Sequence, residues 1–112
     1  LQALRLMAPA IKQSYRNGAD LSARGAMLAG SCMAAISFNK GLGLVHSISH
    51  MVGGLYDTPH GLTNAIILPA VLKYNKPKLE SKIEQIAIAC GAKTKDFEGL
   101  MPFPPVNVLV LL

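Results

Sequence analysis

The sequence has no tryptophan, few other aromatic residues and few charges. Aromatic residues make up 5% of the 112 positions and charged residues 15%, whereas 51% are hydrophobic. So many apolar residues with so few charges exclude an intrinsically disordered chain. A chain of this length can bury the core of one small domain but not of two. Because the composition is somewhat too apolar for a free-standing small globule, we expect other surfaces to cover part of it.

Cysteine is scarce as well, with Cys32 and Cys90 as the two copies in the sequence. Both lie among apolar neighbours, and neither belongs to a CxxC pair. This pattern is typical of buried, reduced thiols. We therefore expect a cytoplasmic protein.

Acidic residues are also few, with 6 Asp and Glu against 11 Lys and Arg, which leaves a net charge of +5. A basic balance can indicate a nucleic acid or an anionic membrane surface as partner. Here the lysines concentrate between Lys73 and Lys95 and alternate with acidic residues. No aromatic side chains accompany them in the stacking arrangement of single-strand binders. We expect a solvated helix face and no nucleic-acid partner.

No apolar run is both long enough and clean enough to predict a membrane span. Residues 25–39 carry no charge, but they are fewer than the roughly 20 residues that a span needs, so they predict a buried helix. The longer weakly charged stretch 41–72 contains three histidines, an aspartate and two prolines, which would be costly in lipid. The sequence also begins without an initiator methionine or a polar helix cap, so we expect a piece of something longer.

Hydrophobic periodicity predicts an all-α fold of about five helices through Gly91. The first helix, with Pro9 as a possible kink, should end at residues 17–18 in a left-handed cap. Asp20 should then cap a second helix that runs to about residue 38. This second helix is rich in small residues, which predicts a central helix that its neighbours approach closely. Those residues are Ala23, Gly25, Ala26, Ala29, Gly30, Ser31, Ala34 and Ala35.

Glycine and proline mark the expected helix ends and starts in the second half of the chain. A third helix is expected over residues 44–52, ended by the glycine pair 53–54. Thr58 as N-cap, with proline after it, should open a fourth helix over residues 60–74, kinked near Pro69.

The same start signal recurs at Asn75 and Pro77, and predicts a fifth helix that Gly91 closes. Beyond residue 100 the sequence pattern changes. Three prolines there exclude a helix, and the β-branched and leucine-rich run that follows has no helical polar face. No structure is predicted there.

The three histidines, His46, His50 and His60, fall within fifteen consecutive positions. His46 and His50 are four apart, so on a helix they project from one face and can converge on one ion, or one can bind while the other assists. Spacing alone leaves open that the pair only packs or caps, as HxxxH pairs more often do. His60 follows a Gly-Gly loop that can fold it back toward His46, which strengthens the metal-site interpretation.

Residues 43–63, GLVHSISHMVGGLYDTPHGLT, resemble the long histidine signature of iron-containing alcohol dehydrogenases. The flanking segments 17–20, 64–69 and 74–75 are similar to the family's usual surroundings, and the resemblance covers roughly residues 1–91. Glycerol dehydrogenases and dehydroquinate synthases share the broader architecture. The sequence GLTNA after the last histidine looks more like the alcohol dehydrogenase branch.

The resemblance implies a metal site made by one aspartate and three histidines, the last two of them fourteen positions apart. His46 and His60 have that separation and would be metal ligands. His50 matches the family's additional active-site histidine, which lies near metal and substrate without binding the metal. Asp57 sits where the family's loop varies and is not expected to replace the aspartate. The family's aspartate and first histidine lie upstream of Leu1, so two of four ligands are expected here.

The same resemblance implies Fe²⁺, or Zn²⁺, as the metal, and hydride transfer between NAD or NADP and a small primary alcohol or aldehyde. In the family a separate α/β domain binds the dinucleotide, and the sequence has no GxGxxG or GGGS-like run. We therefore expect an isolated chain that is inactive. Its apolar helix faces, which in relatives contact the rest of the helical domain, should make it self-associate as a homo-oligomer.

In domain terms, residues 1–100 should be a partial, bundle-like helical metal-binding domain of the dehydroquinate synthase-like and iron alcohol dehydrogenase type. Residues 101–112 should be a divergent tail outside any domain. The alternative is a non-enzymatic helical oligomerising module derived from a truncated dehydrogenase.

Overall fold

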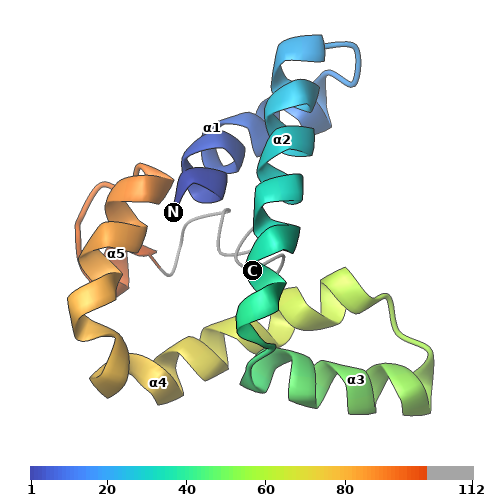
Figure 1. Ribbon diagram of the computed structural model, residues 1–112, viewed down its shortest axis with the longest axis vertical. Coiled ribbons are helices and arrows are strands. Elements are labelled where there is room, and N and C mark those ends of the chain that lie inside the picture. The colour runs from blue at the N-terminus through green and yellow to red at the C-terminus, as the bar shows by residue number, and fades with distance from the viewer. Residues whose placement is uncertain (101–112) are drawn as a thin grey trace.

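The computed structural model describes residues 1–100, apart from the side chains of Glu80 and Leu100. The described chain is all-α, as predicted, and has no strand within that range (Figure 1). The predicted tail, residues 101–112, lies outside the described residues. The elements are α1 (Gln2–Arg16), α2 (Leu21–Ser37), the 3-10 turn η1 (Phe38–Lys40), α3 (Leu44–Tyr56), α4 (His60–Cys90) and the short α5 (Phe97–Leu100).

The turn between α1 and α2 confirms one predicted cap and corrects another. Asp20 caps α2 as expected, because its Oδ1 accepts the backbone N–H of Ala23 at 2.9 Å. Asn17 ends α1 in an extended conformation, with φ −132°, so the predicted left-handed cap is wrong. The Asn17 side chain accepts the N–H of Ala19 at 3.1 Å instead, and this side-chain turn makes a positive φ unnecessary. Pro9 lies inside α1, which continues past it.

Replacing Asp20 with alanine is expected to lower the melting temperature, because the first turn of α2 loses its side-chain acceptor. The Ala23 amide, and then the Gln13 side chain, hold the pKa of Asp20 below its ordinary value of 3.8. The pKa of Asp20 is therefore lower in the folded chain than in the unfolded chain. The ionised carboxylate stabilises the fold above pH 3.8, and this contribution is lost as the pH falls through the folded pKa.

Thermal unfolding followed by circular dichroism at neutral pH and at about pH 3 measures this contribution. The difference between wild type and Asp20→Ala should shrink at the lower pH. Asp20→Asn is the control, because asparagine caps equally well but does not titrate there. Equal melting temperatures for wild type and Asp20→Ala at neutral pH would contradict the cap's role.

Small residues bring α2 against α1, as predicted, at one part of the helix. Gly30 and Ala34 are buried, and a Cβ on Gly30 would overlap the side chain of Met7, which has 0% exposure. Gly25, by contrast, faces open space. The expected close approach therefore occurs at Gly30, where α1 and α2 pack together.

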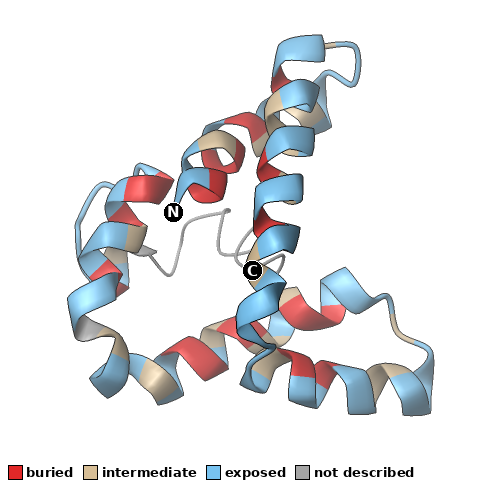
Figure 2. Ribbon diagram, viewed as in Figure 1, coloured by how far each residue is buried: buried red, intermediate tan, exposed pale blue. Residues whose placement is uncertain are grey.

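The prediction that α2 is a central buried helix is wrong. Figure 2 shows most of α2 exposed, and its buried positions are Ala23, Gly30 and Ala34. The opposite face carries large apolar side chains in water, including Leu28 at 75% exposure and Ile36 at 64%. Helical periodicity marks which residues share a face, but it does not say whether a neighbour is present to cover that face.

The segment Leu21–Lys40 is also long and apolar enough, by length and composition, to be a candidate membrane span, with a mean hydropathy of 1.2. One such helix near the N-terminus is weak evidence. The expected absence of a membrane partner stays a prediction.

Helix α3 runs through the glycine pair that was expected to end it and stops at Tyr56. Its cap is Asp57, which adopts the left-handed conformation with φ 50° and ψ 41° and donates its N–H to the Gly53 carbonyl. Aspartate is one of the few non-glycine residues that visit this conformation routinely. Gly53 and Gly54 lie in the last turn of α3 and not in the helix interior, where each would cost roughly 1 kcal/mol relative to alanine.

The predicted fourth and fifth helices are one helix, α4. Thr58 does not cap it; Pro59 occupies the N-cap position. Pro69 and Pro77 lie inside the helix, and α4 changes direction in its second half, where the gold segment turns upward into the orange one (Figure 1). A proline removes one backbone hydrogen bond and bends a helix without having to end it. Gly91 closes α4 in the left-handed conformation, as predicted.

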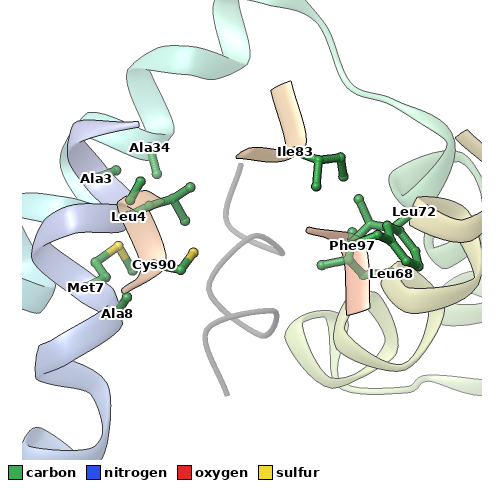
Figure 3. Close-up of a cluster of buried hydrophobic side chains, with 11 residues drawn as sticks. Ala3, Leu4, Met7, Ala8, Ala34, Leu68, Leu72, Ile83, Cys90 and Phe97 are labelled. Carbon is green, nitrogen blue, oxygen red and sulfur yellow. The ribbon is translucent and has the colours of Figure 1, made fainter. Parts of the chain in front are cut away.

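The core gathers side chains from α1, α2, both halves of α4, and α5. Figure 3 shows one group around Leu4, Met7 and Cys90 and another around Leu72 and Phe97. Because α4 bends, its first half contributes to the second group and its last turn reaches α1. The buried cluster consists of Ala3, Leu4, Met7, Ala8, Ala34, Leu68, Leu72, Ile83, Ala89, Cys90 and Phe97.

Candidate metal centre

The α3–α4 hairpin carries all three histidines. His46 and His50 lie one helical turn apart on α3, and His60 is the first residue of α4. The connecting loop is held to α4 by Thr63, whose hydroxyl donates to the Thr58 hydroxyl at 2.7 Å and lies 3.1 Å from the Pro59 carbonyl. These bonds fix the first turn of α4, and with it the direction from which His60 approaches α3.

The three imidazoles converge. The ring centroids of His46 and His50 are 5.7 Å apart, and the His60 centroid lies 5.3 Å from each of them. The loop therefore folds His60 back toward His46, as the sequence suggested. The assignment of His46 and His60 as ligands and of His50 as a catalytic residue stays a prediction.

The environments of the three histidines differ. His46 is buried, at 7% exposure, whereas His50 and His60 are exposed. Phe38 of η1 packs edge-on against the His46 ring, with centroids 5.8 Å apart and an interplanar angle of 74°. Burial, and then the nearby rings of His60 and His50, hold the pKa of His46 below its ordinary value of 6.5. His46 is therefore neutral at physiological pH, the form in which an imidazole can bind a metal.

Asn64 joins two of the histidines, and sequence reasoning did not single it out as a site residue. Its side chain is 1% exposed, and its Nδ2 lies 3.0 Å from His60 Nε2 and 3.4 Å from His46 Nε2. Its Oδ1 is buried without a hydrogen-bond partner among the described residues. The available signal was the four-residue spacing from His60, which puts both side chains on one face of α4.

The residues fit a metal ion as a partial site. Two Nε2 atoms, from His46 and His60, face one buried polar group, and imidazole nitrogen suits iron and zinc. Within residues 1–100, no three His, Cys, Asp or Glu side chains are arranged to hold an ion together. Asp57 is exposed as the cap of α3 and belongs to no such group in the described part of the chain.

The two cysteines have different environments. Cys90 is buried in the core, and burial raises the pKa of its thiol, which keeps it protonated and unreactive. Cys32 is exposed on α2, so the expectation that both thiols are buried is wrong for this one. Cys32 itself lies on the uncovered face of α2, away from the buried Gly30 and Ala34. Sequence context could not distinguish this position from a core position.

Comparison with known proteins extends the resemblance beyond the histidines. The chain is 42% identical over 95 residues to the 1,3-propanediol dehydrogenase of Citrobacter freundii, covering 84% of this chain and 24% of that protein. It is 43% identical over 101 residues to the NAD-dependent methanol dehydrogenase of Bacillus methanolicus, covering 89% and 26%. It is 36% identical over 101 residues to alcohol dehydrogenase 4 of Saccharomyces cerevisiae (strain YJM789), covering 88% and 26%.

The chain therefore spans about a quarter of the length of these curated relatives. No solved structure matches it significantly. Residues 1–100 match the family described as "Fe-containing alcohol dehydrogenase family, C-terminal". Together with the histidine-bearing hairpin, this match shows that the chain belongs to the iron-containing alcohol dehydrogenase family and corresponds to its C-terminal, helical region.

Proposed function

We propose that this chain is part of an iron-dependent alcohol dehydrogenase that transfers hydride between NAD or NADP and a small primary alcohol or aldehyde. In this proposal residues 1–100 are a partial metal-binding domain. They supply two of four ligands to Fe²⁺, or Zn²⁺, through His46 and His60. The named activities of the relatives, on 1,3-propanediol and on methanol, support a small alcohol as substrate.

The convergence of three imidazoles from two helices is the observation that carries this proposal. Geometry also supports the division of roles among them. Asn64 contacts the Nε2 atoms of His46 and His60, and no hydrogen bond joins it to His50. The two histidines that share this buried contact are the pair that the family signature assigns to the metal.

A bound divalent ion would supply a Lewis acid that polarises the substrate's oxygen. The chain's own residues then have separate tasks. His46, buried beneath Phe38, and His60, held by the first turn of α4, are fixed in direction. His50 is exposed beside them, so its ring can reach a substrate from solvent and exchange the hydroxyl proton at a ring nitrogen.

We expect the isolated chain not to oxidise alcohols. Two neutral imidazoles hold a dication weakly, and a hydride acceptor needs a nucleotide-binding surface that positions it. The assay adds Fe²⁺, NAD or NADP and a series of small primary alcohols to the purified chain and follows reduced nicotinamide by absorbance. No turnover above background is expected.

Turnover that His46→Ala abolishes would contradict inactivity. It would indicate that another chain in an oligomer supplies the remaining ligands. His50→Ala is the matched variant in that case, because it should lower turnover without releasing the metal.

The exposed apolar face of α2 supports the second part of the proposal, self-association as a homo-oligomer. Leu21 is 82% exposed, Leu28 75% and Ile36 64%, and their spacing puts them on one side of the helix. Water-exposed apolar surface of this kind drives association. The same face is the observation that favours the alternative function, a non-enzymatic oligomerising module.

Light scattering coupled to size exclusion should show the chain as an oligomer, and Leu28→Glu should shift it toward monomer, because a charge in the buried centre of an apolar contact is costly. Lys12→Glu, an exposed change on α1, is the control. A monodisperse monomer at high concentration would contradict self-association. A chain that oligomerises but binds neither Fe²⁺ nor Zn²⁺ would favour the scaffold.

Location and partners complete the proposal. Free cysteines at positions 32 and 90 support a reducing, cytoplasmic compartment. Neither a nucleic acid nor a membrane is proposed as partner.

A further inference from the structure

Asn64 makes an unusual set of contacts for a buried amide. Its Nδ2 lies within hydrogen-bond distance of two ring nitrogens, His60 Nε2 at 3.0 Å and His46 Nε2 at 3.4 Å. Its Oδ1 has no hydrogen-bond partner among the described residues, although the side chain is 1% exposed. An unpaired buried carbonyl is unfavourable, so the orientation of this amide has to be explained by what its NH₂ group does.

The chemistry of the two groups determines the direction of both hydrogen bonds. An amide nitrogen has two hydrogens and only donates, so each Nε2 that it contacts must accept through its lone pair. A neutral imidazole with a lone pair on Nε2 carries its hydrogen on Nδ1. One amide therefore selects the same tautomer in both histidines and turns both lone pairs toward one point.

We propose that Asn64 is a positioning residue that holds His46 and His60 in the Nδ1–H tautomer, with both Nε2 lone pairs directed into the hairpin for a metal ion to take over. The two N–H donors occupy the lone pairs until a cation replaces them. The hydrogen bonds fix the orientation of both rings in the metal-free chain. Unlike an outer-shell partner, which bonds to the ring nitrogen away from the metal, Asn64 has to release both Nε2 atoms when a cation binds. Only the metal-binding consequence rests on the proposed ligand roles of the two histidines.

The direct test is ¹⁵N NMR of the chain with labelled histidine and no metal, at about pH 8, well above the ordinary histidine pKa. Long-range ¹H–¹⁵N correlations show which ring nitrogen carries the hydrogen. The wild type should show unprotonated Nε2 in both His46 and His60. A wild type with hydrogen on both Nε2 atoms would mean that Asn64 presents its Oδ1 instead, and would overturn the proposal.

Asn64→Asp is the sharpest variant, because it keeps the shape but replaces the two donors by acceptors. It should move the hydrogen to Nε2 in His46 and His60, while His50, which Asn64 does not contact, stays unchanged and serves as the internal control. An unchanged tautomer in a folded Asn64→Asp chain would also overturn the proposal. If the variant does not fold, the wild-type spectrum still decides.

A second arm measures Zn²⁺ affinity by calorimetry. Asn64→Leu, which has a similar volume but no donor, should bind Zn²⁺ at least as tightly as the wild type, because it has no hydrogen bonds to the two Nε2 atoms that the cation must displace. Ser49→Ala is the matched control, since Ser49 is equally buried at 1% exposure but bonds to the His46 carbonyl and to neither ring. A large loss of affinity in Asn64→Leu would overturn the proposal, because it would mean that Asn64 stabilises the metal-bound site and not the metal-free tautomers. A wild type that binds no Zn²⁺ but shows the expected tautomers would refute the ligand roles and leave the positioning role standing.

Discussion

Replacing His46 with alanine is expected to weaken Zn²⁺ or Fe²⁺ binding by at least about 100-fold, to below detection in the isolated chain. Loss of a residue that only orients a ligand costs roughly 10- to 100-fold in affinity. Loss of one of only two ligands should exceed that range. His46 is also the most buried of the three rings, at 7% exposure. Isothermal titration calorimetry with Zn²⁺ and anaerobic titration with Fe²⁺ measure the change.

His50→Ala provides the matched comparison, because His50 lies one turn from His46 on the same helix and its ring is 5.3 Å from that of His60. If His46 and His60 are the ligands, His50→Ala should change metal affinity only slightly, whereas His60→Ala should resemble His46→Ala. Equal losses in all three variants would contradict the assignment of His50 as a residue outside the metal's ligands. No loss in any of them would refute the metal site altogether.

Replacing Gly30 with valine is expected to destabilise the chain by about 1–3 kcal/mol, because it overpacks the contact between α1 and α2. A Cβ at Gly30 overlaps the side chain of Met7 and comes within 3.3 Å of the Ala3 carbonyl oxygen. Met7 has 0% exposure and therefore no free space to move into. Chemical denaturation followed by circular dichroism gives the free energy of unfolding.

The control is Gly25→Val in the same helix, where a Cβ meets nothing within 4 Å. There the change removes a glycine from an exposed helix interior, which alters stability by only a few tenths of a kcal/mol and in the favourable direction. A destabilisation of equal size at both positions would show that helix propensity, and not the contact with Met7, governs the result. If neither variant loses stability, the close approach of α1 and α2 does not contribute to folding in solution.

Some local features were predictable, where a residue acts on its own backbone, although the caps predicted at Asn17 and Thr58 were wrong. The Asp20 cap and the Gly91 stop were both anticipated, because a capping carboxylate and a left-handed glycine depend on interactions within a few residues. The same reasoning was wrong at the glycine pair 53–54 and at Pro77. Each carries a penalty that packing elsewhere in the hairpin and the core can exceed, so helix α3 and helix α4 continue through them.

Burial was less predictable than periodicity. The small residues of α2 were expected to mark a central helix, yet only the face around Gly30 and Ala34 is covered. Which face of a helix is apolar follows from the spacing of its residues. Whether a partner covers that face depends on the other helices present, and those are not encoded within the helix itself. The exposure of Cys32 has the same cause.

The candidate site was likewise predictable from the sequence only in part. The sequence by itself determined the family, the three histidines and their order, because a dense motif and a four-residue spacing are local properties of the chain. Only the tertiary structure decided that the ring centroids of His60 and His46 lie 5.3 Å apart and that the buried Asn64 contacts the Nε2 atoms of both rings. The physical reason is that ring distances and hydrogen bonds between two helices depend on the angle at which a loop sets one helix against the other. Here the Thr58–Thr63 hydrogen bond and the left-handed cap at Asp57 set that angle, through contacts that no spacing rule contains.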